Sequence, residues 1–359
     1  MAPAGSTKTV DQERVKAAAA GLLGIYTGSI LTQLIELGTT TGLLEATVAG
    51  GTSKEISRRA GLQERYVREW LGGMTTGGLV SYDAESGSYT LPAEHALLLT
   101  KGSPRSLAPL SGLLDGLVRH LPAITECFQR GGGVPESAYW PEFSTGLDGT
   151  WRTIYDHQLV DGFLSIDPLI VERLESGCRV ADVGCGTGHA VNVMAQRFPK
   201  SEFVGFDSSA AAIARAVAES RASGCRNAHF EALDIAQLPS DPGFDLVTAF
   251  DVIHDLADPF GTLRRIAQAL RAGGAFLMVE FKFSSHLEKN LGNPFAALYY
   301  GVSLLHCMPV SLEEGGAGLG VLWGTERTRE ALAEAGLGEV TLHDSPRPQN
   351  CVYICRKGR

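Results

Sequence analysis

The sequence has little positive charge. Lysine and arginine total 31 against 40 aspartates and glutamates, which gives a net charge of −9. Because a nucleic-acid-binding domain normally carries a basic surface, this balance opposes a nucleic-acid partner, and it gives no attraction to an anionic membrane. No apolar run approaches the roughly 20 residues that span a bilayer, and Met1 to Val10 lack a signal-peptide pattern. We expect a cytoplasmic protein with no membrane and no nucleic-acid partner.

Cysteine is also scarce. The chain has 7 cysteines, an odd number, and they are widely scattered, which does not suit a disulfide framework. Only Cys351 and Cys355 lie close together, and alternate residues of a strand share one face. A structural zinc site needs four ligands, and no second Cys/His pair lies nearby. We expect buried strand cysteines and no metal.

A glycine-rich stretch, Arg179 to His189, organises the second half of the chain. It reads as a short apolar strand that breaks into a turn and opens a helix, which is typical of nucleotide sites in α/β sheets. The dinucleotide fingerprint G-x-G-x-x-G would need glycine at position 189, where this chain has histidine. The pattern present is D-x-G-x-G-x-G, with Asp182 two places before Gly184. It resembles the first motif of class I S-adenosylmethionine (SAM) dependent methyltransferases.

The surrounding pattern is that of a doubly wound α/β domain. Predicted strands alternate with helices of ten or so residues, which favours a parallel sheet. The strands are expected at 179–183, 203–206, 227–231, 244–250 and 275–281. Two final strands, 339–343 and 350–355, would form the antiparallel edge hairpin usual in this methyltransferase fold. We therefore expect a Rossmann-like fold with a mostly parallel sheet.

The first hundred residues have a different pattern. An apolar helical stretch, 13–37, is expected to stop at Gly38. Two short helices and a hairpin then follow, which is the order of a winged helix-turn-helix. A DNA reader is the alternative, but residues 1–100 hold 8 basic and 10 acidic side chains. The order resembles the N-terminal domain of small-molecule O-methyltransferases, which implies dimerisation and closure over the acceptor pocket.

These patterns divide the chain into three parts. We expect a winged-helix dimerisation domain at 1–100, a helical connector at 101–165 and the methyltransferase domain at 166–359. An insertion at 284–324 would act as a lid. Its glycine run, 315–320, imitates a phosphate loop, but no strand precedes it, so we interpret it as a hinge.

The resemblance implies SAM as cofactor and S-adenosylhomocysteine as product. Glycines without Cβ atoms let the backbone approach the methionine part, and an acidic residue after the second strand suits the ribose hydroxyls. The resemblance further implies an adenine clamp after the third strand, an aromatic near the sulfonium and a carboxylate that reaches the ammonium through water. The cofactor residues expected are Asp182, Gly184, Cys185, Gly186, Gly188, Asp207, Ser208, Asp234, Ile235 and Phe250.

His254 is the expected catalytic residue. The segment Ile253-His254-Asp255 resembles the "LHDWxD" stretch of the same O-methyltransferases, which implies a histidine general base. An imidazole with a pKa near ~6.5 is suited to accept a hydroxyl proton at neutral pH. The tryptophan of that stretch is Leu256 here, and a histidine satisfied within a loop is the alternative.

The acceptor is expected to be a small molecule with an acidic hydroxyl. The residues expected to contact it are Tyr155, Asp255, His306 and Trp323. Two alternatives stay open: N-, S- or C-methyl transfer driven by proximity, and a SAM-sensing transcriptional regulator. The N-terminal domain favours a homodimer.

Overall fold

The computed structural model describes residues 10–103, 105–139, 142–239 and 243–358. The chain divides into two compact units, Met1–Asp115 and Gly116–Arg359. The helix α6 (Pro109–Val118) crosses the boundary between them.

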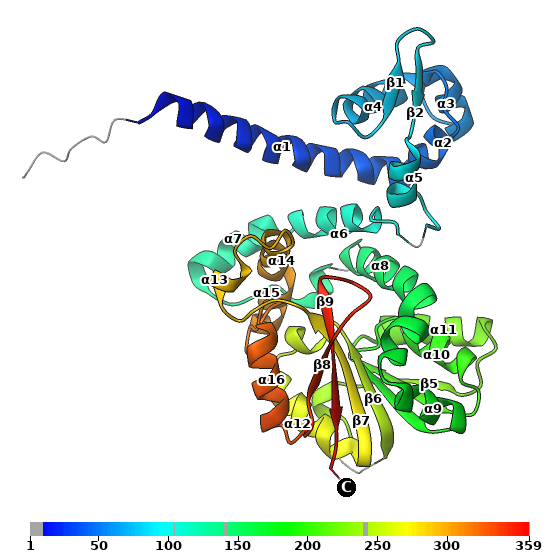
Figure 1. Cartoon of the computed structure of the whole chain (residues 1–359), viewed down its shortest axis with the longest axis vertical. Helices are drawn as coiled ribbons and strands as arrows, with labels where there is room; N and C mark the ends of the chain where they lie inside the picture. Colours follow the sequence, from blue (N-terminus) through cyan, green and yellow to red (C-terminus); the bar gives the residue numbers. More distant parts are fainter. Residues whose placement is uncertain (1–9, 104, 140–141, 240–242, 359) are drawn as a thin grey trace, which may run out of the picture. The chain divides into compact units, whose positions relative to one another are not determined.

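The N-terminal unit contains the predicted winged helix-turn-helix (Figure 1). A capping box between Thr52 and Glu55 starts the first helix of the motif, because it satisfies backbone N–H groups that the helix leaves free. The elements are α1 (Gln12–Thr41), α2 (Leu43–Val48), α3 (Ser53–Ala60), α4 (Glu64–Thr76), the hairpin of β1 (Ser81–Asp83) and β2 (Ser88–Thr90), and α5 (Ala93–Leu99).

The first helix runs past the predicted stop at Gly38 and ends before Gly42. Gly38 serves packing instead, since a Cβ there would lie 2.7 Å from the Cζ2 atom of Trp70. The indole Nε1 of Trp70 donates a hydrogen bond to the Leu34 carbonyl at 2.7 Å. This contact holds the end of α1 against α4.

Most of α1 is exposed, including several large apolar side chains. By length and composition alone the helix could cross a membrane, since an 18-residue window has a mean hydropathy of 1.4 with none of it buried. This helix corrects the expectation that no apolar run approaches the length that spans a bilayer. The window is rich in alanine, leucine and isoleucine, and the charged residues of the helix lie toward its two ends.

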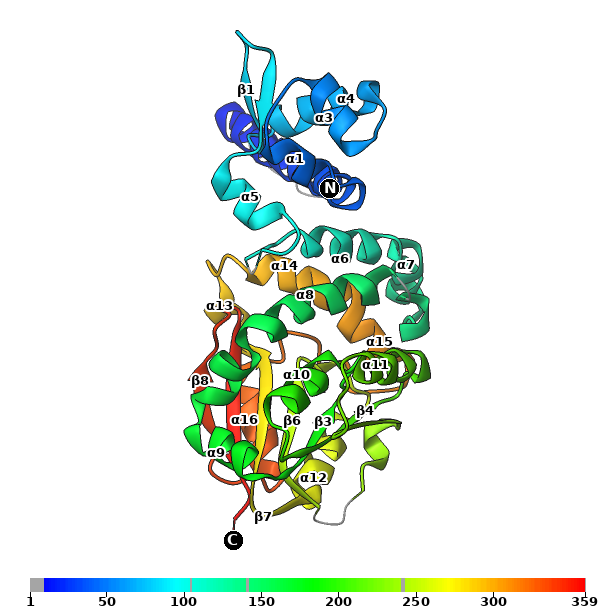
Figure 2. The ribbon, with the colours of Figure 1, turned by 90° about the vertical axis from the view of Figure 1, so that its right-hand side faces the viewer.

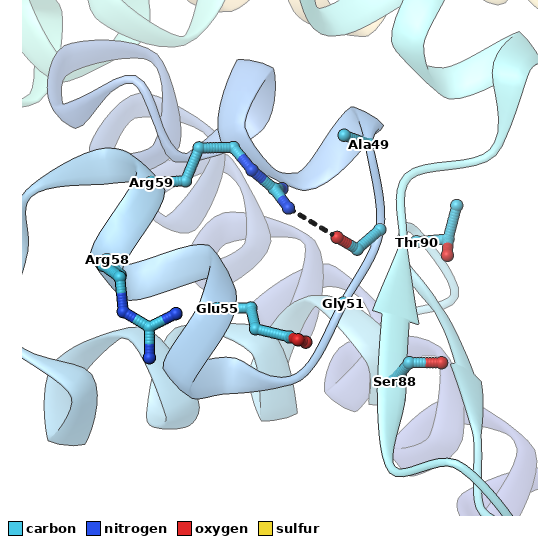
Figure 3. Close-up of a pocket in the computed structure, with 8 residues that line it drawn as sticks. Ala49, Gly51, Glu55, Arg58, Arg59, Ser88 and Thr90 are labelled. Carbon is cyan, nitrogen blue, oxygen red and sulfur yellow. Dashed lines mark hydrogen bonds between the residues drawn. The ribbon is translucent and has the colours of Figure 1, made fainter.

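A shallow hollow lies beside the hairpin of this unit (Figure 3). The Arg59 guanidinium reaches across it and donates to the carbonyl of Gly50 at 2.9 Å. Gly51 pairs with Tyr89 through two backbone hydrogen bonds. The backbone hydrogen bonds between Gly51 and Tyr89 therefore join the loop after α2 to the hairpin of β1 and β2.

The C-terminal unit is built on a seven-stranded sheet of order β5-β4-β3-β6-β7-β9-β8 (Figures 1 and 2). The first five strands in that order are parallel, and β9 pairs antiparallel with both β7 and β8. The predicted parallel sheet and antiparallel edge are confirmed. The strands are β3 (Arg179–Val183), β4 (Glu202–Asp207), β5 (Ala228–Ala232), β6 (Phe244–Phe250), β7 (Leu270–Phe281), β8 (Thr341–Asp344) and β9 (Asn350–Arg356).

Helices cover both faces of this sheet, because successive strand residues point to opposite sides. On one face α9 (Pro168–Ser176) and α10 (His189–Arg197) bury their apolar side chains. On the other face α12 (Pro259–Ala269) and α16 (Gly324–Glu334) do the same. The helix α11 (Ala210–Ala222) packs beside β4 and β5. Full burial of a strand residue such as Val247 favours folding by about 1.5–3 kcal/mol.

Further helices lie over the carboxyl ends of the parallel strands (Figures 1 and 2). They come from the segment before β3 and from the insertion after β7. The first group is α7 (Leu121–Arg130), η1 (Glu136–Tyr139) and α8 (Glu142–Gln158). The second is α13 (Leu287–Asn290), α14 (Ala296–Val302), the π-helical turn η6 (Ser303–Cys307) and α15 (Met308–Glu313).

Candidate active site

A cavity lies at the carboxyl ends of β3, β4 and β6, where ligands bind in open α/β sheets. Residues of the glycine turn, of α8, of the segment after β6 and of the insertion line it. They are Glu136, Leu147, Asp148, Trp151, Tyr155, Gly184, Cys185, Gly186, Thr187, His189, Asp207, Ser209, Ala212, Phe250, Asp251, Val252, Asp255 and His306.

The glycine turn forms the floor of the cavity through Gly184 and Gly186. Gly186 has a φ of 53°, in the region that favours glycine, and its N–H donates to Asp207 Oδ2 at 2.8 Å. Gly188 does not line the cavity. A Cβ there would lie 2.5 Å from atoms of Ala216 and Phe230, so this glycine lets α10 pack against its neighbours.

Asp207, one of the expected cofactor residues, ends β4 and lines the cavity. Its other oxygen, Oδ1, accepts from the Ser209 N–H at 2.9 Å. Burial raises the pKa of its carboxyl, although these two backbone hydrogen bonds act in the opposite direction. Ser209, rather than the predicted Ser208, lines the cavity, and its hydroxyl caps α11.

Asp182 is buried behind the glycine turn and does not line the cavity. Thr248 donates to its Oδ1 at 2.6 Å. Burial raises the pKa of Asp182 to about 7, because the charged form loses its water. A cation close to this carboxylate would favour its charged form.

The predicted adenine clamp lies outside the cavity lining. Asp234 is exposed and caps the short helix η4 (Ile235–Gln237) by accepting from the Ala236 N–H at 2.9 Å. Ile235 is buried in the core of the C-terminal unit.

An aromatic wall closes one side of the cavity. Phe250 ends β6, and the ring of Tyr155 meets its ring edge-on with centroids 5.4 Å apart. Tyr155 also stacks on Trp151, with centroids 5.3 Å apart. The predicted Phe250 and Tyr155 therefore lie together against the cavity, whereas Trp323 is buried in the core and does not line it.

His254 belongs to the short helix η5 (Ile253–Asp255), and its ring lies between the carboxylates of Asp255 and Glu280. Its Nδ1 is 2.8 Å from Glu280 Oε2, and its Nε2 is 3.2 Å from Asp255 Oδ1. The ring is 1% exposed and does not itself line the cavity, which Asp255 does. Burial alone would lower the pKa of His254, but the charges of Asp255 and Glu280 raise it well above its usual value.

Glu280 was not among the site residues predicted from the sequence. This residue is fully buried on β7 and is the one acidic side chain in an apolar run that extends from Ala275 to Phe281. A carboxylate in such a run has to find a partner when it is buried, and this was the signal available. The partner is His254.

A second missed feature is an ionic network around Arg152 of α8. Arg152 donates to Asp148 at 2.9 Å, to Glu219 at 2.6 Å and to the Thr187 hydroxyl at 3.1 Å. His189 joins it through Glu219. The network ties α8 to the glycine turn and to α11.

The cavity has an acidic lining. Five carboxylates face it, and among its described lining residues there is no lysine or arginine. They are Glu136, Asp148, Asp207, Asp251 and Asp255. Asp251 has a φ of 60°, and burial together with the charge of Glu280 raises its pKa to about 7. His306 also lines the cavity, and burial lowers its pKa to about 4. Such a lining suits a ligand that carries positive charge.

Two family matches cover most of the two units. Residues 174–323 match a methyltransferase domain family, and residues 29–101 match the Rv2258c-like winged HTH domain family. Among curated proteins, the trans-aconitate 2-methyltransferase of Deinococcus radiodurans is 36% identical over 129 residues, which are 35% of this chain. The matched part spans 47% of that relative, so the chain covers about half of its length.

Solved structures share the fold over nearly the whole chain. A suspected O-methyltransferase of Nostoc punctiforme is 19% identical with a TM-score of 0.74, covering 94% of this chain and 99% of its own. Human N-acetylserotonin methyltransferase, solved with SAM, is 19% identical with a TM-score of 0.71, covering 98% and 99%. The chain therefore combines a winged helix-turn-helix domain with a methyltransferase domain that follows it, and it shares its fold with these solved methyltransferases.

Proposed function

We propose that the protein transfers a methyl group from SAM to the hydroxyl of a small molecule and releases S-adenosylhomocysteine. The observation that supports this proposal is the acidic cavity at the carboxyl ends of β3, β4 and β6, where the glycine turn donates a hydrogen bond to Asp207. SAM supplies an electrophilic methyl group on a sulfonium cation, and its amino group is a second positive charge. The lining carboxylates fit both charges.

Different residues would bind different parts of SAM. The backbone of Gly184, Cys185 and Gly186 would lie against the methionine part, and Asp207 would accept from the ribose hydroxyls. Asp182 would act on the ammonium group through water. Phe250 would pack near the sulfonium. Asp234 and Ile235 follow the neighbouring strand β5, and we propose them for the adenine end.

His254 would be the general base. Glu280 accepts from Nδ1–H, which leaves Nε2 as the nitrogen that can take a proton. The acceptor oxygen would lose its proton to Nε2 as it attacks the methyl carbon, and the sulfur would leave as a neutral thioether. Asp255, which lies 3.2 Å from this nitrogen, and His306 both line the cavity and would contact the acceptor.

The pH dependence of methyl transfer should follow the His254 imidazole. Because Asp255 and Glu280 raise its pKa, the ring carries a proton near pH 6.5 and must lose it before it can act as a base. We expect kcat/KM to rise with pH along a limb displaced above 6.5. Asp255→Asn removes one of the raising charges, so its limb should lie at lower pH. Rate profiles measured from about pH 5.5 to about 9.5 test this, and coincident limbs would contradict it.

The acceptor should be neutral or cationic. Asp148 is paired with Arg152, but the other four lining carboxylates would repel a polyanion, and no described lysine or arginine of the lining would bind it. We expect trans-aconitate, the substrate named for curated relatives, to be turned over at least about 10²-fold more slowly than the best neutral hydroxyl compound, a difference of about 2.7 kcal/mol.

The function is tested by S-adenosylhomocysteine release. The full chain is incubated with SAM and a panel of phenols, aliphatic alcohols, amines, thiols and carboxylic acids. We expect release with hydroxyl compounds that depends on both acceptor and enzyme. Release with amines or thiols that survives loss of His254 would replace O-methylation with proximity-driven transfer.

We also propose that the protein is a homodimer through its N-terminal unit. In support, α1 exposes a series of large apolar side chains along its length, each at least half accessible, which a second copy would bury: Leu22, Leu23, Ile25, Tyr26, Ile30 and Leu37. An interface of standard size removes about 800 Å² from each partner, and a 30-residue helix can provide much of that area.

Charged residues introduced on α1 should therefore dissociate the dimer. We expect wild type to elute with the mass of a dimer in light scattering and Leu23→Glu/Ile30→Glu to be monomeric. Val48→Glu, at an exposed apolar position of α2, is the matched control and should remain dimeric. A monomeric wild type would contradict the proposal.

A further inference from the structure

We propose that His254, Asp255 and Cys307 form a binding site for one zinc-class divalent cation beside the cavity. The proposal goes beyond methyl transfer and does not depend on it.

The three side chains already converge. One ligand atom from each lies within 4.8 Å of the other two. His254 and Asp255 come from η5, and Cys307 ends the π-helical turn η6, a type of turn often found at functional sites. Ligands of a tetrahedral zinc ion, at about 2.0–2.3 Å from the metal, lie about 3.5 Å from each other. Small side-chain rotations would close the present spacing to that value.

Glu280 prepares His254 as a ligand. It accepts from Nδ1 at 2.8 Å and is fully buried, so it fixes the ring and leaves Nε2 facing Asp255. A histidine that binds a metal usually donates its other N–H to a carboxylate or a carbonyl in this way. A second group of possible ligands, Asp251 with His254 and Glu280, would have to break this hydrogen bond.

The chemical types of the three ligands determine which cation would bind. Asp255 Oδ1 is buried without a hydrogen bond of acceptable geometry, although Nε2 is only 3.2 Å away. A divalent cation would balance the charges of this carboxylate and of a Cys307 thiolate, and the thiol proton and the Nε2 proton of a charged His254 ring would both pass to the buffer. Sulfur and imidazole ligands favour zinc or cobalt over magnesium and calcium.

The cation would leave one coordination position open, as three protein ligands do in tetrahedral sites. Asp255 lines the cavity, so the cation would lie beside the place proposed for the acceptor. It would also occupy Nε2 of His254. Zinc should therefore inhibit methyl transfer, and a chelator should reverse the inhibition.

Cobalt substitution tests the site without reference to activity. Metal-free full chain is titrated with Co²⁺, and the near-ultraviolet thiolate-to-cobalt charge-transfer band and the visible bands of tetrahedral Co²⁺ are recorded. We expect both to saturate at one equivalent and to be displaced by Zn²⁺. Cys307→Ser should lose the charge-transfer band, and Glu280→Gln should weaken binding by about 10- to 100-fold.

Two further variants serve as a control and as a second ligand substitution. Cys178→Ser removes a half-buried thiol whose Sγ accepts from the Ser201 hydroxyl at 3.7 Å, and it should bind Co²⁺ as wild type does. Asp255→Asn provides a second ligand change if Cys307→Ser does not fold, and it should weaken binding at least tenfold. Absence of stoichiometric Co²⁺ binding by wild type, or unchanged spectra in both ligand variants, would overturn the proposal. Neither result bears on whether SAM binds.

Discussion

Replacing His254 with alanine should lower kcat/KM by about 10²–10⁴-fold, the usual contribution of a positioned general base. The affinity for SAM should change little, because the ring is buried and does not line the cavity. The measurement pairs S-adenosylhomocysteine release with calorimetric titration of SAM. His254 is buried, so thermal unfolding of the variant must be followed as well.

Glu280→Gln is the matched variant for this prediction. Glutamine keeps the size of the side chain and can still accept from Nδ1, but it removes the charge that supports the imidazolium. We expect an intermediate loss of kcat/KM, and thermal unfolding of this variant is followed as well, because it removes one charge of a buried pair. Full activity in His254→Ala would exclude the base role and favour transfer by proximity.

Replacing Asp207 with alanine should weaken SAM binding by about 10²-fold or more. Hydrogen bonds to a charged group contribute about 1.5–3 kcal/mol each, and Asp207 would make two with the ribose. The substitution also removes the acceptor of the Gly186 and Ser209 N–H groups, so the glycine turn loses its support. Calorimetry or a thermal-shift titration with SAM measures the loss.

Glu231→Ala is the control for Asp207→Ala. Glu231 is exposed on β5 and lies outside the cavity lining, so its loss should cost less than about tenfold in SAM affinity, or about 1.4 kcal/mol. Equal losses in the two variants would contradict the assignment of Asp207 to the ribose.

The sequence predicted the parts of the fold that local patterns determine. Strand and helix periodicity gave the parallel sheet, and the glycine turn gave the position of the cavity. The positions of Asp207 and Phe250 at the cavity were predictable, because both residues end strands on the same edge of a parallel sheet, where ligands bind.

The rest depends on contacts that no local pattern determines. His254 meets Glu280, which is 26 residues later, only because the register of β6 and β7 places the two elements side by side. Arg152 precedes Thr187 by 35 residues, and their contact follows from how α8 packs on the glycine turn. Trp323 was predicted to line the pocket, but an apolar side chain in an insertion can equally fill the core, which is where it lies.

The choice of cofactor is the central claim, and it depends on the glycine turn, where histidine occupies position 189 in place of the glycine of a dinucleotide fingerprint. Calorimetric titration of the full chain with SAM and, separately, with NAD tests it most directly. We predict that SAM binds at one site per chain and that NAD gives no binding heat. Binding of NAD as tight as that of SAM, or no binding of SAM, would contradict the claim.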